Sequence, residues 1–176
     1  MFDKEYSFHA SHAEKVIALT AQFGNSAKTK LFATNRDVYI IAPIIGFLYN
    51  RNTPMDKSTD KTTKIFPNEL TREEKVMWYN YRLIMLLDTK REPDLDKRMD
   101  KAFRYYGKPE AVNDEAWYNQ YVLGGVDVLY EKLIEGAKNS DDYPTKFVDF
   151  MEEFEERYNT NIPASEVVDL CIKARS

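Results

Sequence analysis

The sequence predicts an all-α fold, a single compact domain of about six or seven helices that spans residues 1–176. A length of 176 residues is typical of one domain. The composition is 43% hydrophobic and 31% charged, which is a globular balance and argues against general disorder. Only 6 Gly and 7 Pro interrupt the chain, which favours helices joined by short loops over an all-β fold.

The N-terminal part predicts a first helix over residues 12–22. Ser11 followed by Glu14 has the spacing of a capping box, and apolar residues then recur at intervals of three and four. Gly24 supplies the left-handed conformation that ends a helix. Residues 1–9 contain aromatic side chains and fit either a short N-terminal strand or a segment that covers the core.

The second helix contains the longest uncharged run of the chain, residues 38–49. Its predicted start is Thr34, whose hydroxyl can accept a hydrogen bond from the amide of Asp37. Pro43 removes a backbone donor, which predicts a kink or two abutting helices. Gly46 has no side chain and would allow another element to approach closely. The run is therefore expected to lie at the centre of the core.

Residues 51–66 are polar and lack apolar periodicity, so they predict a long mobile loop or linker. Thr71 and Glu74 then form a capping box that opens the next helix. Gly124-Gly125 lies in the middle of a long helical pattern and predicts a break, a bend or a tight helix crossing. The predicted helices after the loop cover 71–89, 94–106, 111–137, 144–158 and 164–174.

Targeting signals are not evident in the sequence. The uncharged run of 12 residues is shorter than the about 20 that a membrane helix needs. The N-terminus lacks the basic and then apolar pattern of a signal peptide. The single cysteine, Cys171, rules out an internal disulfide. These observations predict a cytoplasmic protein without a membrane segment.

Sequence motifs for catalysis are missing, so the sequence predicts no catalytic residue, no cofactor and no metal site. His9 and His12 have a spacing that metal ligands use, but no downstream Cys or His completes a set. Cys171 falls in the apolar stripe of the last predicted helix, where a buried thiol is the default. Asp88 and Asp127 are the two acids in apolar surroundings, and pairing with Arg82 or Arg104 would make them structural.

The charge is uneven along the chain. Residues 24–66 hold seven basic and three acidic residues, whereas residues 110–158 hold 13 acids and four bases. Basic side chains around a helix start can hold a phosphate backbone, which predicts weak, salt-sensitive nucleic-acid binding. An acidic pI of about 5.3 opposes this interpretation. The candidate contact residues are Lys28, Lys30, Arg36, Arg51, Lys57, Lys61 and Lys64.

Residues 31–54 resemble a motif of small accessory proteins from Dnd-type DNA-phosphorothioation loci. The likeness consists of Phe-x-Thr-x-x-Asp-Val at 32–38, an apolar run with Ala42, the pair Gly46-Phe47 and a basic exit at Arg51. It covers about 25 of 176 residues, and Pro43 departs from the small residue usual in that motif. The resemblance implies a non-enzymatic component of a bacterial DNA-modification or antiphage defence system.

The sequence thus predicts a non-enzymatic accessory or adaptor protein that assembles with a partner protein through an aromatic or apolar surface. Homo-oligomers are among the assemblies it allows. One alternative is a small enzyme with a carboxylate-based site at Asp88 or Asp127. Another is a mobile-element protein that binds and blocks a host factor, which the sequence does not separate from the adaptor.

Overall fold

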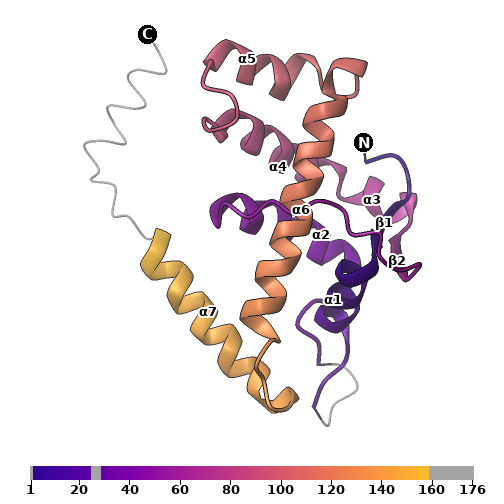
Figure 1. The fold of residues 1–176 in the computed structure, drawn as a ribbon, viewed down its shortest axis with the longest axis vertical. Helices are drawn as coiled ribbons and strands as arrows, with labels where there is room; N and C mark the ends of the chain where they lie inside the picture. Colours follow the sequence, from indigo (N-terminus) through magenta and orange to yellow (C-terminus); the bar gives the residue numbers. More distant parts are fainter. Residues whose placement is uncertain (1, 25–28, 159–176) are drawn as a thin grey trace.

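The computed structural model describes residues 2–24 and 29–158. It confirms a mostly helical domain with seven α-helices and one two-stranded antiparallel sheet in that part of the chain (Figure 1). The strands are β1 (Tyr6–His9) and β2 (Thr62–Ile65). The helices are α1 (Ala10–Thr20), α2 (Asn35–Leu48), α3 (Pro67–Arg72), α4 (Glu74–Leu87), α5 (Leu95–Met99), α6 (Val112–Leu133) and α7 (Tyr143–Tyr158). The predicted helix 164–174 and Cys171 lie outside the described residues.

The N-terminal residues form the strand that was one of two expectations. Strand β1 pairs with β2 in the register Tyr6 opposite Ile65 and His9 opposite Thr62. Because the chain turns directly from β1 into α1, the helix begins at Ala10 and Ser11 is not its cap. The Ser11 hydroxyl instead donates to Asp56 (2.5 Å).

The expectation of a loop over all of residues 51–66 is wrong, because β2 occupies its last part. Threonine and isoleucine favour extended backbone, and Ile65 is buried against the core. The first part of the segment is also anchored, since the Thr53 amide donates to the carbonyl of Gln120 (3.0 Å). Asp56 in turn binds Ser11 of α1.

Helix α2 starts as the sequence predicts. The Thr34 hydroxyl accepts from the Asp37 amide (3.4 Å), and the Asp37 carboxylate accepts from the Thr34 amide (2.9 Å). The helix continues through Pro43 to Leu48, so the two abutting helices that were one expectation do not occur. The run 38–49 lies in the core as expected, but only half of its twelve residues are buried, five are half-buried and Ile41 is exposed.

Helix α4 does not start at the predicted capping box. Thr71 lies inside α3, and its hydroxyl donates to the carbonyl of Pro67 (2.9 Å). Proline favours the first position of a helix, and the Glu69 carboxylate accepts from the Phe66 amide (3.1 Å). These local contacts place a short separate helix ahead of α4.

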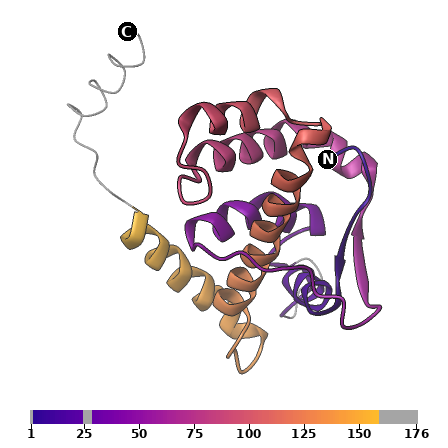
Figure 2. The same cartoon turned by 45° about the horizontal axis from the view of Figure 1, so that its top comes forward.

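The centre of the fold is a close crossing of α2 and α6, the most extensive helix pair (Figures 1 and 2). Helix α6 is continuous through Gly124 and Gly125, so a crossing is the correct one of the three expectations. A Cβ atom on Gly125 would lie 1.7 Å from the Ala42 carbonyl oxygen, and one on Gly46 would lie 2.1 Å from the Tyr121 carbonyl oxygen. These glycines therefore set the distance between the two helices.

Candidate functional site

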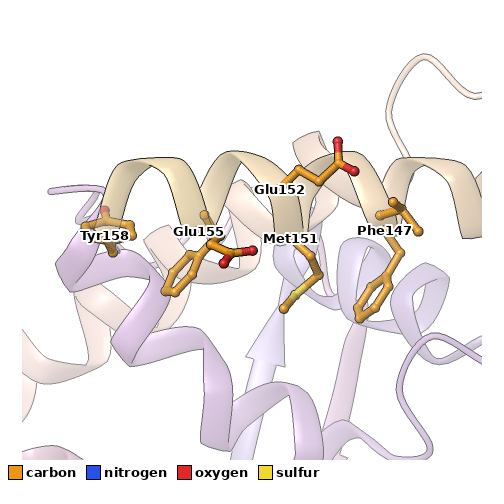
Figure 3. A pocket seen from close by; sticks show the side chains of 7 residues that line it. Phe147, Met151, Glu152, Glu155 and Tyr158 are labelled. Carbon is orange, nitrogen blue, oxygen red and sulfur yellow. The ribbon is translucent and has the colours of Figure 1, made fainter. Parts of the chain in front are cut away.

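Helix α7 lies along the edge of the fold (Figure 1) and carries an exposed apolar surface. Phe147, Val148 and Met151 are between 45% and 52% exposed. They line a surface pocket together with Glu152, Phe154, Glu155 and Tyr158, all of which belong to α7 itself, and we call this surface the α7 groove. Figure 3 shows Phe147 and Met151 projecting from the same side of the helix.

The inner side of α7 is firmly attached to the ends of α2 and α6. Phe150 is buried, and its ring lies 6.3 Å from that of Tyr49. The Tyr158 hydroxyl donates to the carbonyl of Leu48 (2.7 Å). The Glu153 carboxylate accepts from Lys132 (2.5 Å) and from the Tyr49 hydroxyl (3.2 Å). The groove is therefore held in place by contacts that the same helix makes with α2 and α6, and Tyr158 contributes both to these contacts and to the groove.

Phe147, Phe150 and Met151 recur at spacings of three and four within the predicted helix 144–158, and this pattern does not say which of them the fold leaves exposed. Of the three, only Phe150 is buried, because the contact with α2 and α6 is narrower than the apolar stripe. Val148 makes the apolar stripe wider than one contact can cover, and its position next to Phe147 in the sequence could have indicated that part of the stripe is exposed. A helix with more apolar surface than its contacts cover presents a candidate binding surface.

Asp88 is buried at the end of α4 and accepts three hydrogen bonds. The donors are the Tyr121 hydroxyl (2.9 Å), Trp117 Nε1 (3.1 Å) and the Arg91 amide (3.1 Å). The predicted arginine partners lie elsewhere: the Arg82 guanidinium stacks over Trp78, and Arg104 pairs with Asp100. A carboxylate with its lone pairs occupied in this way has a structural role.

Asp127 is also buried and joins α6 to α1 and to the segment that follows α2. Its carboxylate binds Lys15 Nζ (2.7 Å) and the Thr53 hydroxyl (2.8 Å), and His12 Nε2 lies 3.3 Å away. Burial alone would raise the pKa of the Asp127 carboxyl, but the contacts with His12, Lys15 and Thr53 outweigh it and hold that pKa well below its usual range. A carboxyl held ionised in this way is unsuited to act as a general acid near neutral pH.

Replacing Asp127 by asparagine is expected to lower the free energy of unfolding by about 2 kcal/mol at neutral pH, the scale of lost charged hydrogen bonds. The folded-state pKa of Asp127 lies below the unfolded value of about 4. The stabilisation is therefore fully present above the unfolded pKa, and it is lost progressively as the pH falls from there through the folded-state pKa. Urea denaturation at neutral pH and at about pH 3 measures this, and the gap between variant and wild type should narrow in acid. An equal gap at both pH values would contradict the assignment.

The basic residues predicted to contact nucleic acid are mostly engaged with acids. Ion pairs join Arg36 to Asp37 (3.1 Å), Arg51 to Glu131 (2.7 Å), Lys61 to Glu14 (3.2 Å) and Lys64 to Glu5 (2.8 Å). Lys30 Nζ lies 3.4 Å from the Ala33 carbonyl oxygen, Lys57 is exposed, and Lys28 lies outside the described residues. Neighbouring carboxylates weaken the field that a phosphate backbone needs, so nucleic-acid binding stays a prediction.

The histidines do not form a metal site with other residues of the described chain. His12 is buried beside Asp127, whereas His9 ends β1. Among residues 2–24 and 29–158, no group of three His, Cys, Asp or Glu side chains is placed to hold a metal ion. No helix in the described part of the chain combines the length and apolar character that crossing a membrane demands.

Comparison with known proteins adds no relative. No protein-family model, no curated protein and no solved structure matches this chain.

Proposed function

We propose that this chain is a non-enzymatic accessory or adaptor protein that assembles with a partner protein through the α7 groove. The observation that carries this proposal is the exposed apolar side of an otherwise anchored helix, with Phe147, Val148 and Met151 at its centre. Large apolar side chains gathered in a groove are typical of helix-binding surfaces. The buried, hydrogen-bonded state of Asp88 and Asp127 supports a protein without carboxylate catalysis.

The biological setting of this adaptor is proposed from the sequence resemblance at residues 31–54. A bacterial DNA-modification or antiphage defence complex is the setting that the resemblance implies. The partner would then be another protein of such a complex. The ion pairs of Arg36, Arg51, Lys61 and Lys64 favour protein contacts over nucleic-acid contacts as the main interaction.

Met151→Asp is expected to weaken partner binding strongly without unfolding the protein. A charge placed in an apolar contact loses its hydration, so affinity should fall at least about tenfold, which corresponds to about 1.4 kcal/mol. The measurement is capture of tagged full-length protein from its native host, with quantitative mass spectrometry of the retained proteins. DNA-modification, nuclease or ATPase proteins among those lost would support the proposed setting.

Ile17→Asp on α1 is the matched control, because Ile17 is 43% exposed and lies on a different helix. Both variants should melt near the wild-type temperature, and Ile17→Asp should retain the partner. A partner that remains bound to Met151→Asp would show that the α7 groove is not the docking surface.

A further inference from the structure

The α7 groove reaches the last described residue of the chain. Tyr158 both lines the groove and fixes the end of α7, because its hydroxyl donates to the carbonyl of Leu48 (2.7 Å). The sequence continues from this fixed point through residues 159–176, which lie outside the described residues. The 159–176 segment is therefore tethered at one end of the groove.

The sequence of this segment predicts a change of direction followed by an amphipathic helix. Pro163 disfavours helical backbone at the residue before it, so α7 is not expected to run on through this point. In the predicted helix 164–174, the spacing of Val167, Val168 and Cys171 gathers them on one side. The charged residues of this helix fall on the other side, and they are Glu166, Asp169 and Lys173. Such a helix needs an apolar surface to cover its apolar side.

The predicted helix and the α7 groove match in length. A helix rises by about 1.5 Å per residue, so a helix over 164–174 that runs back along α7 from Tyr158 reaches Phe147 at the other end of the groove. A short connection between two helices favours such an antiparallel pair. Cys171 then lies beside Met151, because it is as far beyond Ala164 as Met151 is before Tyr158.

Tethering favours the 159–176 segment over a separate molecule as the occupant of the groove. A short linker gives the tethered helix a local concentration of about millimolar, which a free molecule reaches only in a concentrated solution. The surface that this helix would cover is the exposed apolar side of α7, with Phe147, Val148 and Met151. Covering it would not disturb Phe150, which is already buried against the fold.

We propose that residues 164–174 bind the α7 groove of the same molecule and cover it until a partner protein displaces them. This inference rests on the proposed function of the α7 groove and names its regulation. A partner binds only those molecules in which the groove is open, so the cover lowers the apparent affinity by the open fraction.

The test uses Cys171, the single cysteine of the chain, as a probe of the covered groove. Full-length Met151→Cys is placed in a buffer of oxidised and reduced glutathione, and mass spectrometry with non-reducing electrophoresis follows disulfide formation. We expect an intramolecular disulfide in the monomer. Adding Val168→Asp should slow its formation at least about tenfold, because a charge weakens an apolar contact.

Glu156→Cys is the matched control. Glu156 is exposed, lies on α7 outside the groove and is closer to Cys171 in the sequence than Met151 is. A freely moving segment would close the disulfide in Glu156→Cys at least as fast as in Met151→Cys, because the loop is shorter. A segment bound in the groove should instead favour Met151→Cys at least about tenfold. Both variants should melt near the wild-type temperature when reduced.

Two outcomes would overturn the inference. One is an equal or faster disulfide in Glu156→Cys. The other is a covalent dimer of Met151→Cys in place of the intramolecular disulfide, because a second copy would then occupy the groove.

The two redox forms of Met151→Cys separate this inference from the proposed function. In the capture experiment the reduced form should retain the partner and the oxidised form should lose it. If no intramolecular disulfide forms but Met151→Asp still loses a host protein, the proposed function stands and only the cover is rejected. If the disulfide forms but both forms capture the same host proteins, the α7 groove is not the docking surface, and the proposed function fails together with the regulation.

Discussion

Replacing Gly125 by alanine is expected to cost at least about 4 kcal/mol of unfolding free energy and to leave little folded protein. The new Cβ atom would lie 1.7 Å from the Ala42 carbonyl oxygen and 2.5 Å from the Ala42 carbonyl carbon. Both are backbone atoms, so relief requires α2 and α6 to move apart along the crossing at the centre of the core. Helix propensity alone predicts the opposite sign, because alanine stabilises a helix interior by about 1 kcal/mol relative to glycine.

Urea denaturation of the full-length variants measures the effect, with soluble yield as a second readout. Gly136→Ala is the control, since Gly136 has a φ of +75° and no atom within 4 Å of an added Cβ. Its cost should be only the about 1–2 kcal/mol of a left-handed alanine. A Gly125→Ala variant as stable as the wild type would contradict the close crossing.

The crossing also shows which features of the fold were predictable. Gly46 and Gly124-Gly125 predict a close approach because a missing side chain is a local feature of the sequence. They do not identify the partner helix, since α2 and α6 are separated by more than sixty residues. The capping box at Thr34 was predictable for the same reason, because all of its atoms lie within four residues.

The wrong predictions arise where neighbouring residues or another element, rather than the local sequence pattern, decide the secondary structure. Residues 62–65 contain one buried side chain, Ile65, and become a strand because β1 lies alongside them. At Thr71 the capping pattern was present, but Pro67 and Glu69 start a helix a few residues earlier. Neither outcome follows from periodicity alone.

For the candidate sites, the sequence indicated the unusual residues but not their contacts or their exposure. Apolar neighbours marked Asp88 and Asp127 as unusual acids, whereas most of their partners come from elements far along the chain, such as Tyr121 and Lys15. The apolar stripe of α7 was visible, but its exposed side depends on how narrowly the helix contacts α2 and α6. Surface exposure is a property of the assembled fold.

The second large effect is expected at Asp88, where alanine should lower the free energy of unfolding by about 3 kcal/mol. The substitution removes the acceptor of the Tyr121 hydroxyl, the Trp117 indole and the Arg91 amide at once. Buried donors without an acceptor retain the full cost of leaving water, which is why this loss exceeds that of an ordinary hydrogen bond. Urea denaturation followed by tryptophan fluorescence reports the change beside Trp117 directly.

Two further variants separate this structural role from a general effect of removing an acid. Asp88→Asn retains a carbonyl oxygen and should lose about half as much stability as Asp88→Ala. Asp96→Ala removes an exposed acid from α5 and should change stability by less than about 0.5 kcal/mol. If Asp88→Ala unfolds at the same urea concentration as the wild type, the three hydrogen bonds do not stabilise the fold. The buried Asp88 carboxylate would then favour the alternative of an enzyme with a carboxylate-based site.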